Sequence, residues 1–263
     1  MDTLAPEILV EESESYARVI FNRPHVRNAI TGQMWAELPK IIRRLERRRQ
    51  IHAILLSGAG SKAFASGADI GELPRFTEPK AARAYETLVL RALDSVVRCP
   101  LPVIAMIRGY TMGGGFYIAA ACDLRIAGES AQLGIPAAKL GSAVSPSVAA
   151  RLVGLVGPAV AKEILFSGQP LDARRALQVG LVNHVVPDSK LEGFTLGLVW
   201  QIAANAPLTI RHAKQTVNWI ASEVERRPPK ELQQHVVKAF GSRDFKEGLD
   251  AFLSRRPPKF SGR

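Results

Sequence analysis

Two short apolar runs, each followed by a glycine-rich segment, constrain the fold of this chain most strongly. The runs His52–Ser57 (HAILLS) and Pro102–Ile107 (PVIAMI) contain no acidic residue, lysine or arginine, which is typical of strands covered on both faces. Each run leads through a turn of small residues into a helical stretch, Lys80–Arg98 and Gly114–Ala121 respectively. Strands that alternate with helices favour right-handed crossovers and parallel pairing. We therefore expect an α/β fold.

Further elements follow the same pattern in the first half of the chain and give way to helices in the second. Strands are expected at Tyr16–Asn22 and Leu124–Ala127, and a helix at Thr31–Gln50. Thr31 is a suitable N-cap, whereas Pro39 should kink this helix or delay its regular part. The later helices are expected at 146–156, 159–166, 173–177, 191–204, 207–224, 230–240 and 243–254. A change of composition near 187–190 divides the chain into a core, residues 1–188, and a helical C-terminal region, residues 189–263.

The charge balance favours a polyanionic partner. The 263 residues include 35 Lys and Arg against 24 Asp and Glu, which gives a formal net charge of +11. Nucleic acid, an acidic membrane or a phosphorylated cofactor would all fit such a balance. The basic residues are concentrated in Ile41–Gln50 (IIRRLERRRQ) and in the last stretch, 226–263. Solvated helix faces would explain the same residues, and this alternative stays open.

Several classes of protein and site are excluded by the sequence. Cys99 and Cys122 are too few for a disulfide framework and indicate a reducing compartment. The acidic N-terminus lacks the apolar core of a signal peptide, and no apolar run reaches the ~20 residues of a membrane helix. We therefore expect a soluble, cytoplasmic protein. No metal site is expected, because the five histidines have no metal-ligand spacing. The phosphate-binding glycine motifs of dinucleotide and Walker-type enzymes do not occur.

The two glycine-containing turns carry the most chemical information. They are Ala63–Ile70 (AFASGADI) and Gly109–Gly115 (GYTMGGG). Small residues let a ligand approach the backbone and leave N–H groups free to point at it. The second turn also opens a helix, whose N-terminal N–H groups favour developing negative charge. Two N–H groups from separate turns could form an oxyanion hole, although tight turns with close helix–sheet packing would explain the same glycines.

In this order, these segments closely resemble the crotonase (enoyl-CoA hydratase/isomerase) superfamily. The resemblance runs from about residue 17 to the C-terminus. It rests on Asn22-Arg23-Pro24 with Asn28-Ala29, then on AFASGADI, PVIAMIRGYTMGGG, ACDLRIA, GQPLDA, ALQVGLVN and FKEG. It implies a crotonase-like spiral of ββα turns with a C-terminal helical trimerisation region. It also implies a homotrimer or a dimer of trimers that takes acyl-CoA thioesters, with coenzyme A as part of the substrate and no bound cofactor.

The resemblance further implies the positions of the site residues. The N–H groups of Ala68 and Gly114 would bind the thioester carbonyl oxygen and stabilise the enolate formed next to it. At the C-terminus, Phe252 and Arg255 stand where some members contact the nucleotide end, with a core Phe and a solvated Arg as the open alternative. The remaining positions that match the path of the CoA are Val26, Asn28, Ala65, Gly67, Asp69 and Ile70.

The sequence departs from the family at the residues that move protons. Typical hydratases carry one glutamate three residues after the oxyanion glycine and another twenty residues further on, where this chain has Tyr117 and Ala137. Hydration needs a base for water and an acid for the alpha carbon, so the paired-glutamate mechanism does not carry over to this divergent member. Tyr117 can donate a proton, or it is simply a packed helix residue. Ser145 matches a nucleophile position of a dehalogenase relative, or it caps the helix that begins at Pro146.

Three functions remain open at this point. The first is an acyl-CoA enzyme that forms a thioester enolate, for decarboxylation, isomerisation or hydration. The second is a protein that binds acyl-CoA without turnover. The third is RNA binding through the basic segment Ile41–Gln50, which lies in a place comparable to the basic helix of an RNA-binding branch of the family. Contacts of that kind would be mostly to phosphate and therefore salt-dependent.

Overall fold

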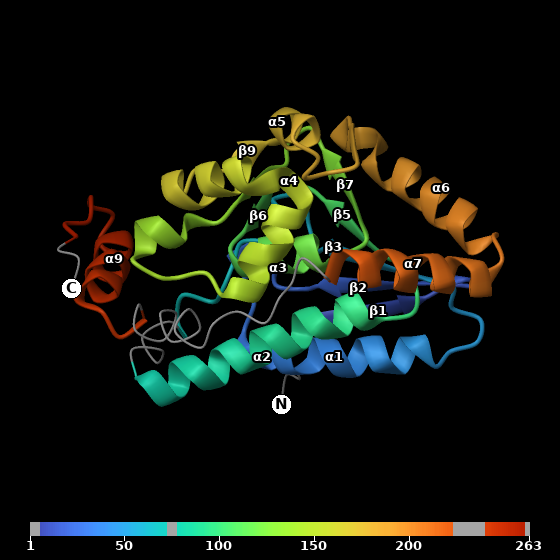
Figure 1. Ribbon diagram of the computed structural model, residues 1–263, viewed down its shortest axis with the longest axis horizontal. Helices are drawn as coiled ribbons and strands as arrows, with labels where there is room; N and C mark the ends of the chain where they lie inside the picture. Colours follow the sequence, from blue (N-terminus) through green and yellow to red (C-terminus); the bar gives the residue numbers. More distant parts are fainter. Residues whose placement is uncertain (1–5, 73–77, 223–239, 261–263) are drawn as a thin grey trace.

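A six-stranded sheet runs through the centre of the structure, a computed structural model that describes residues 6–72, 78–222 and 240–260 (Figure 1). Its strand order is β1-β2-β3-β5-β7-β10. β1 pairs antiparallel with β2, and the other neighbours pair parallel. The bounds are β1 Ile8–Glu12, β2 Tyr16–Phe21, β3 Ala53–Gly58, β5 Val103–Ile107, β7 Leu124–Gly128 and β10 His184–Val186. The expected parallel α/β architecture is confirmed.

A second, smaller sheet makes each turn of the chain a repeat of two strands and a helix. Its order is β4-β6-β8-β9, with bounds Ala63–Ala65, Tyr110–Met112, Gln132–Gly134 and Leu171–Asp172. After β3 the chain adds β4 and then α2 (Pro79–Arg98), and after β5 it adds β6 and then α3 (Gly114–Ala121). After β7 come β8, the short 3-10 helix η3 (Pro136–Leu140) and α4 (Pro146–Ser167). This is the spiral of ββα turns that the resemblance implies.

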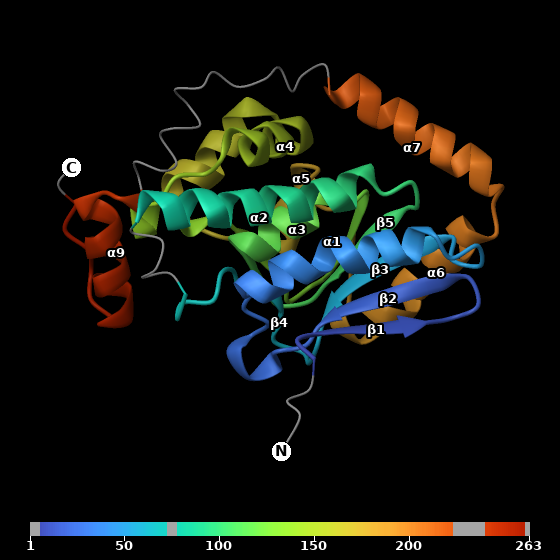
Figure 2. The same ribbon diagram turned by 90° about the horizontal axis from the view of Figure 1, so that it is seen from below.

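Helices cover both faces of the large sheet. α1 (Gly32–Glu46) and α2 lie side by side, as Figure 2 shows, and contribute Trp35, Leu38 and Leu93 to the main core. On the other face, α6 (Leu191–Ala203) packs Leu191 and Val199 against residues of β3, β5 and β7. The other helices of the described residues are η1 (Pro24–Val26), α5 (Ala173–Gln178), η4 (Asp188–Lys190), α7 (Pro207–Ser222) and α9 (Arg243–Leu253). The proposed division into residues 1–188 and 189–263 stays a prediction.

The helix starts agree with the sequence better than the helix ends. Thr31 caps α1, because its hydroxyl oxygen accepts a hydrogen bond from the Met34 N–H at 3.1 Å. The regular part is not delayed by Pro39. The helix ends at Glu46 rather than Gln50, and residues 47–50 are all exposed, so this segment has no buried face to extend the helix.

The helices expected at 146–156 and 159–166 form α4, which is broken at Gly157, where φ is 74° and ψ is 167°. The helix expected at 230–240 falls almost wholly outside the described residues.

Candidate active site

The two small-residue turns lie next to each other because the strands that precede them are neighbours. β3 and β5 pair in the large sheet, and β4 and β6 pair in the small one. The contact is so close that a Cβ atom on Gly67 would lie 3.3 Å from the Met112 carbonyl oxygen. A Cβ on Gly113 would lie 3.7 Å from the Cα of Gly67. With φ at 114° and 47°, both positions also need a backbone conformation that favours glycine.

The backbone amides of Ala68 and Gly114 lie close together at this contact. The point where Gly114 would carry a Cβ lies 3.8 Å from the Ala68 nitrogen. Neither N–H donates a hydrogen bond to a group within the part of the chain that the structure describes. Gly114 is the first residue of α3, so its N–H has no acceptor inside the helix. The two amides and the positive end of the helix dipole could together receive an oxygen that gains negative charge.

The loop that carries Ala68 is fixed to the start of α1. The Ile30 N–H donates to the Gly67 carbonyl at 2.8 Å, and the Asp69 N–H donates to the Ile30 carbonyl at 2.9 Å. These two bonds flank Ala68, so its own N–H faces away from Ile30. A little further along, the Glu72 carboxylate accepts a hydrogen bond from the Gly32 N–H at 2.8 Å. The Ala68 amide is therefore held in a fixed orientation before any ligand arrives.

Tyr117 is the polar side chain of α3 that stands one helical turn after Gly114. It is partly buried against the main core, and burial raises the pKa of its hydroxyl above the usual value. The phenol is therefore neutral in the physiological range. Ala137 lies in η3 and is buried, and it offers no group for proton transfer.

Ser145 caps α4, with its hydroxyl oxygen accepting from the Val148 N–H at 3.4 Å and Pro146 as the first helical residue. This is the capping role that the sequence analysis left open beside catalysis.

Six of the residues expected along the CoA path surround the first turn. Val26 and Ile70 are each 38% exposed, Ala65 is buried, and Gly67 forms the turn itself. Asn28 is fully buried with φ at 56°, and its side chain makes three hydrogen bonds, to the Arg23 N–H and to the carbonyls of Ala59 and Ala63. Its amide thus holds the turn together.

Asp69 is occupied within the protein. Its carboxylate accepts from Arg23 Nη1 at 2.6 Å and from the Gly71 N–H at 2.9 Å. Burial alone would raise the pKa of Asp69, but these hydrogen bonds and the Arg23 charge outweigh burial and lower it. Asp69 can therefore fix the shape of the loop, and any contact with a ligand would share its carboxylate with Arg23.

The other two expected CoA residues lie on and just after α9, which docks on η3. A Cβ on Gly248 would lie 2.6 Å from the Leu140 carbonyl carbon, and one on Gly141 would lie 2.5 Å from the Asp244 carbonyl carbon. Phe252 is 55% exposed and is not a core residue in this chain, and Arg255 is exposed as well. Their contact with a nucleotide stays a prediction.

Trp35, which lies beside Gly114, and its hydrogen-bond partner Tyr85 were not anticipated as site residues. Trp35 of α1 is fully buried, and its Cζ2 atom lies 2.8 Å from the point where Gly114 would carry a Cβ. Its Nε1–H donates to the Tyr85 hydroxyl oxygen of α2 at 3.1 Å. The sequence places Trp35 on the apolar face of its helix, but no local pattern indicates a partner 50 residues away.

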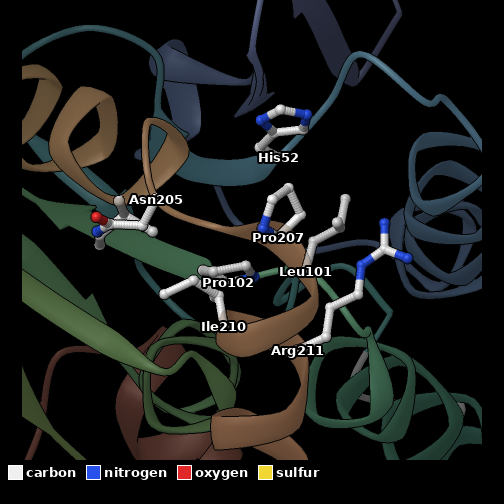
Figure 3. Close-up of a pocket in the computed structure, with 8 residues that line it drawn as sticks. His52, Leu101, Pro102, Asn205, Pro207, Ile210 and Arg211 are labelled. Carbon is white, nitrogen blue, oxygen red and sulfur yellow. The ribbon is translucent and has the colours of Figure 1, made fainter.

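Other surface features lie away from the two turns. Exposed Lys40, Arg43, Arg44, Arg47 and Arg48 line a basic hollow on α1. A small pocket (Figure 3) lies where β3 and β5 begin, at the opposite ends of these strands from the turns. It is lined by His52, Leu101, Pro102, Ile202, Asn205, Pro207, Ile210 and Arg211.

The described residues offer neither a metal site nor a membrane-spanning helix. In the three described segments, no three His, Cys, Asp or Glu side chains are grouped as metal ligands. No helix in those segments has the length and hydropathy needed to cross a membrane.

One family of known proteins matches nearly the whole chain. The model of the enoyl-CoA hydratase/isomerase family matches residues 11–263. The putative enoyl-CoA hydratase/isomerase YngF of Bacillus subtilis is 34% identical over 254 residues, 95% of this chain and 96% of that one. The short-chain-enoyl-CoA hydratase of Clostridium acetobutylicum is 32% identical over 252 residues, 95% of each chain.

Solved structures give the same result. An enoyl-CoA hydratase/carnithine racemase from Magnetospirillum magneticum has a TM-score of 0.80 and 34% identity, covering 98% of this chain and 97% of that one. A methylmalonyl-CoA decarboxylase in complex with 2-nitronate-propionyl-CoA has a TM-score of 0.89 and 30% identity, covering 98% and 99%. With nearly the whole chain matched in sequence and in fold, this protein belongs to the enoyl-CoA hydratase/isomerase family.

Proposed function

We propose that this chain is an acyl-CoA enzyme that stabilises a thioester enolate with the N–H groups of Ala68 and Gly114. The observation that carries this proposal is a pair of backbone amides from adjacent turns, close together at the N-terminus of α3, neither of which donates to a group within the described residues. Donors fixed in this way need no rearrangement when charge develops on the carbonyl oxygen, and that is why such sites accelerate enolate formation. Family membership supports a thioester as the ligand.

Among the reactions that pass through such an enolate, decarboxylation of a malonyl-type thioester fits the side chains best. The bond between the alpha carbon and the carboxylate breaks, CO2 leaves, and the electron pair forms the enolate held by the two amides. The Tyr117 O–H then gives its proton to the alpha carbon, and water restores that proton. A neutral buried phenol suffices here, because a thioester enolate is far more basic than a phenolate. The fold similarity to a methylmalonyl-CoA decarboxylase supports this choice.

Hydration of an enoyl thioester is the second candidate, and the names of the sequence relatives favour it. It requires a group that activates water as well as a proton donor. Tyr117 and Ala137 stand at the two positions where typical members carry these carboxylates. We therefore expect hydration to be slow relative to decarboxylation.

The test compares two substrates on the same preparation. Methylmalonyl-CoA is followed by release of CO2, and crotonyl-CoA by loss of its conjugated thioester absorbance. CO2 release that exceeds crotonyl-CoA hydration supports the proposal, and the reverse order supports the second candidate. Calorimetric binding of both thioesters without turnover would instead indicate a binding protein.

The RNA-binding alternative has its own readout. It predicts retention on RNA at moderate salt that is lost when Arg47, Arg48 and Arg49 are changed to Ala. The family resemblance also leads us to propose a homotrimer or dimer of trimers, which light scattering of the intact chain would test.

A further inference from the structure

The Trp35 indole of α1 connects the proposed amide pair to two other helices, since it lies beside Gly114 of α3 and donates to Tyr85 of α2. Trp35 extends from α1 so that its Cζ2 atom lies 2.8 Å from the position of a Cβ on Gly114, and the Ala68 nitrogen lies 3.8 Å from that same position. The ring is fully buried. Its edge therefore occupies the space beside both amides, where a side chain on residue 114 would otherwise stand. Water cannot occupy this side of the amide pair while the indole is in place.

A hydrogen bond to a second helix fixes the indole in a way that an apolar pocket alone would not. Trp35 Nε1–H donates to the hydroxyl oxygen of Tyr85 at 3.1 Å. Tyr85 comes from α2, which lies alongside α1 and also packs on α3 (Figure 2). Because a buried indole N–H without an acceptor is costly, this bond favours one orientation of the ring over others that the surrounding apolar side chains would allow.

Tyr85 and Tyr117 both pack against the main core. Burial raises the pKa of Tyr85, the hydrogen bond from Trp35 opposes this effect, and the charges that Tyr117 and Glu72 can carry raise the pKa further. The groups that act on Tyr85 in the described part of the chain include the Trp35 indole, the Tyr117 phenol and the Glu72 carboxylate, which also accepts a hydrogen bond from the Gly32 N–H.

We infer that Tyr85 is a positioning residue of the site: its hydroxyl holds the Trp35 indole against Gly114 and Ala68, so that the amide pair stays dry and aimed at the thioester oxygen. The inference rests on the proposed function of that amide pair. It assigns Tyr85 no contact with the substrate and no proton transfer. Dry surroundings strengthen the interaction of an N–H group with a developing oxyanion, so a loosened indole weakens catalysis without removing either donor.

The test uses Tyr85→Phe, which removes the acceptor and keeps the ring, with Tyr16→Phe as the matched control. Tyr16 contacts Trp200 edge-on and packs on the face of the large sheet that α6 covers, away from the amide pair. Carbonyl polarisation is read directly from a cinnamoyl-type CoA thioester whose absorption maximum moves to longer wavelength when its carbonyl is polarised. We expect the shift to be smaller in Tyr85→Phe and unchanged in Tyr16→Phe. We also expect kcat to fall about tenfold or more with KM nearly constant, the pattern of a loss confined to the transition state.

The outcomes separate this inference from the proposed function. If the unmodified protein shifts the probe and Tyr85→Phe shifts it equally, the positioning role is overturned while the amide pair stands. If the unmodified protein binds the probe with no shift, the amide pair fails, and the inference fails with it.

A second variant covers the case in which Tyr85→Phe does not fold. Trp35→Phe removes the N–H donor of the same bond, so it should reduce the shift as well, and an unreduced shift in this variant would overturn the inference. If both single variants fold, the double variant should be no worse than the more impaired single one, since both remove one interaction. Additive losses would contradict the inference.

Discussion

The N–H of Gly114 can be removed and its effect separated from the cost of adding a side chain. Gly114→Pro deletes this N–H, and Gly114→Ala keeps it. Both substitutions introduce a Cβ 2.8 Å from Trp35 Cζ2, so both must displace the indole. Overpacking of this kind costs about 1–3 kcal/mol. Because both variants share the Cβ contact, the ratio of the two kcat values reports the replacement of the N–H by the proline ring.

The expected ratio follows from the role proposed for this donor. Loss of one donor from an oxyanion site costs about 3 kcal/mol, or roughly a hundredfold or more in kcat. Proline is tolerated here as a helix residue, because Gly114 is the first residue of α3 and its N–H has no acceptor in the helix. Gly113 also lacks the Cβ that normally clashes with a following proline ring.

The assay is CO2 release from methylmalonyl-CoA at saturating substrate, with the folded fraction of each variant measured by thermal unfolding. We expect Gly114→Ala to retain part of the activity and Gly114→Pro to be about a hundredfold slower than Gly114→Ala. Equal kcat values for the two variants, at equal folded fractions, would remove the Gly114 N–H from the mechanism.

Three further predictions concern the framework of the site. Gly248→Ala should destabilise the docking of α9, because the new Cβ would lie 2.6 Å from backbone atoms. Gly193→Ala in α6 should be neutral or stabilising, because its Cβ would have nothing within 4 Å. Urea unfolding of the two variants compares these effects. Asn28→Ala should lower the unfolding free energy by about 3–4 kcal/mol, since three buried hydrogen bonds are lost and φ stays positive; a loss below 1 kcal/mol would contradict this. Burial alone would raise the folded-state pKa of Asp69, but the contacts with Arg23 and the Gly71 N–H outweigh burial and lower it. The stabilisation by this carboxylate is therefore present above the unfolded pKa of about 4 and is lost as the pH falls through the lower folded pKa. Unfolding at pH 7 and at pH 3 should therefore show a smaller difference between Asp69→Asn and the unmodified protein at the lower pH.

The long strands and most helices could be predicted because their residues carry the pattern within a single segment. The apolar runs before the two turns became β3 and β5, and α3 has the bounds expected from the sequence. The small sheet was missed, because strands of two or three residues are too short to show an alternation. β1 was missed as well, although it has five residues.

Some residues of the candidate site could be predicted from a local sequence pattern, and others could not. Ala68 and Gly114 could be proposed because small residues in a turn are visible locally. The bond between Trp35 and Tyr85 joins two helices, and the docking of α9 depends on Gly248 facing a turn more than a hundred residues earlier. Neither contact leaves a signal near the residues that make it, since tertiary packing alone brings them together.

The origin of the two proposed donors has a consequence for how this scaffold can change its chemistry. The groups that would bind the thioester belong to the main chain, whose course is set by neighbouring strands and by glycines at close contacts. The groups that would handle protons are ordinary side chains on α3 and η3. A few point mutations can therefore exchange one reaction for another, while recognition of the ligand is inherited unchanged with the fold.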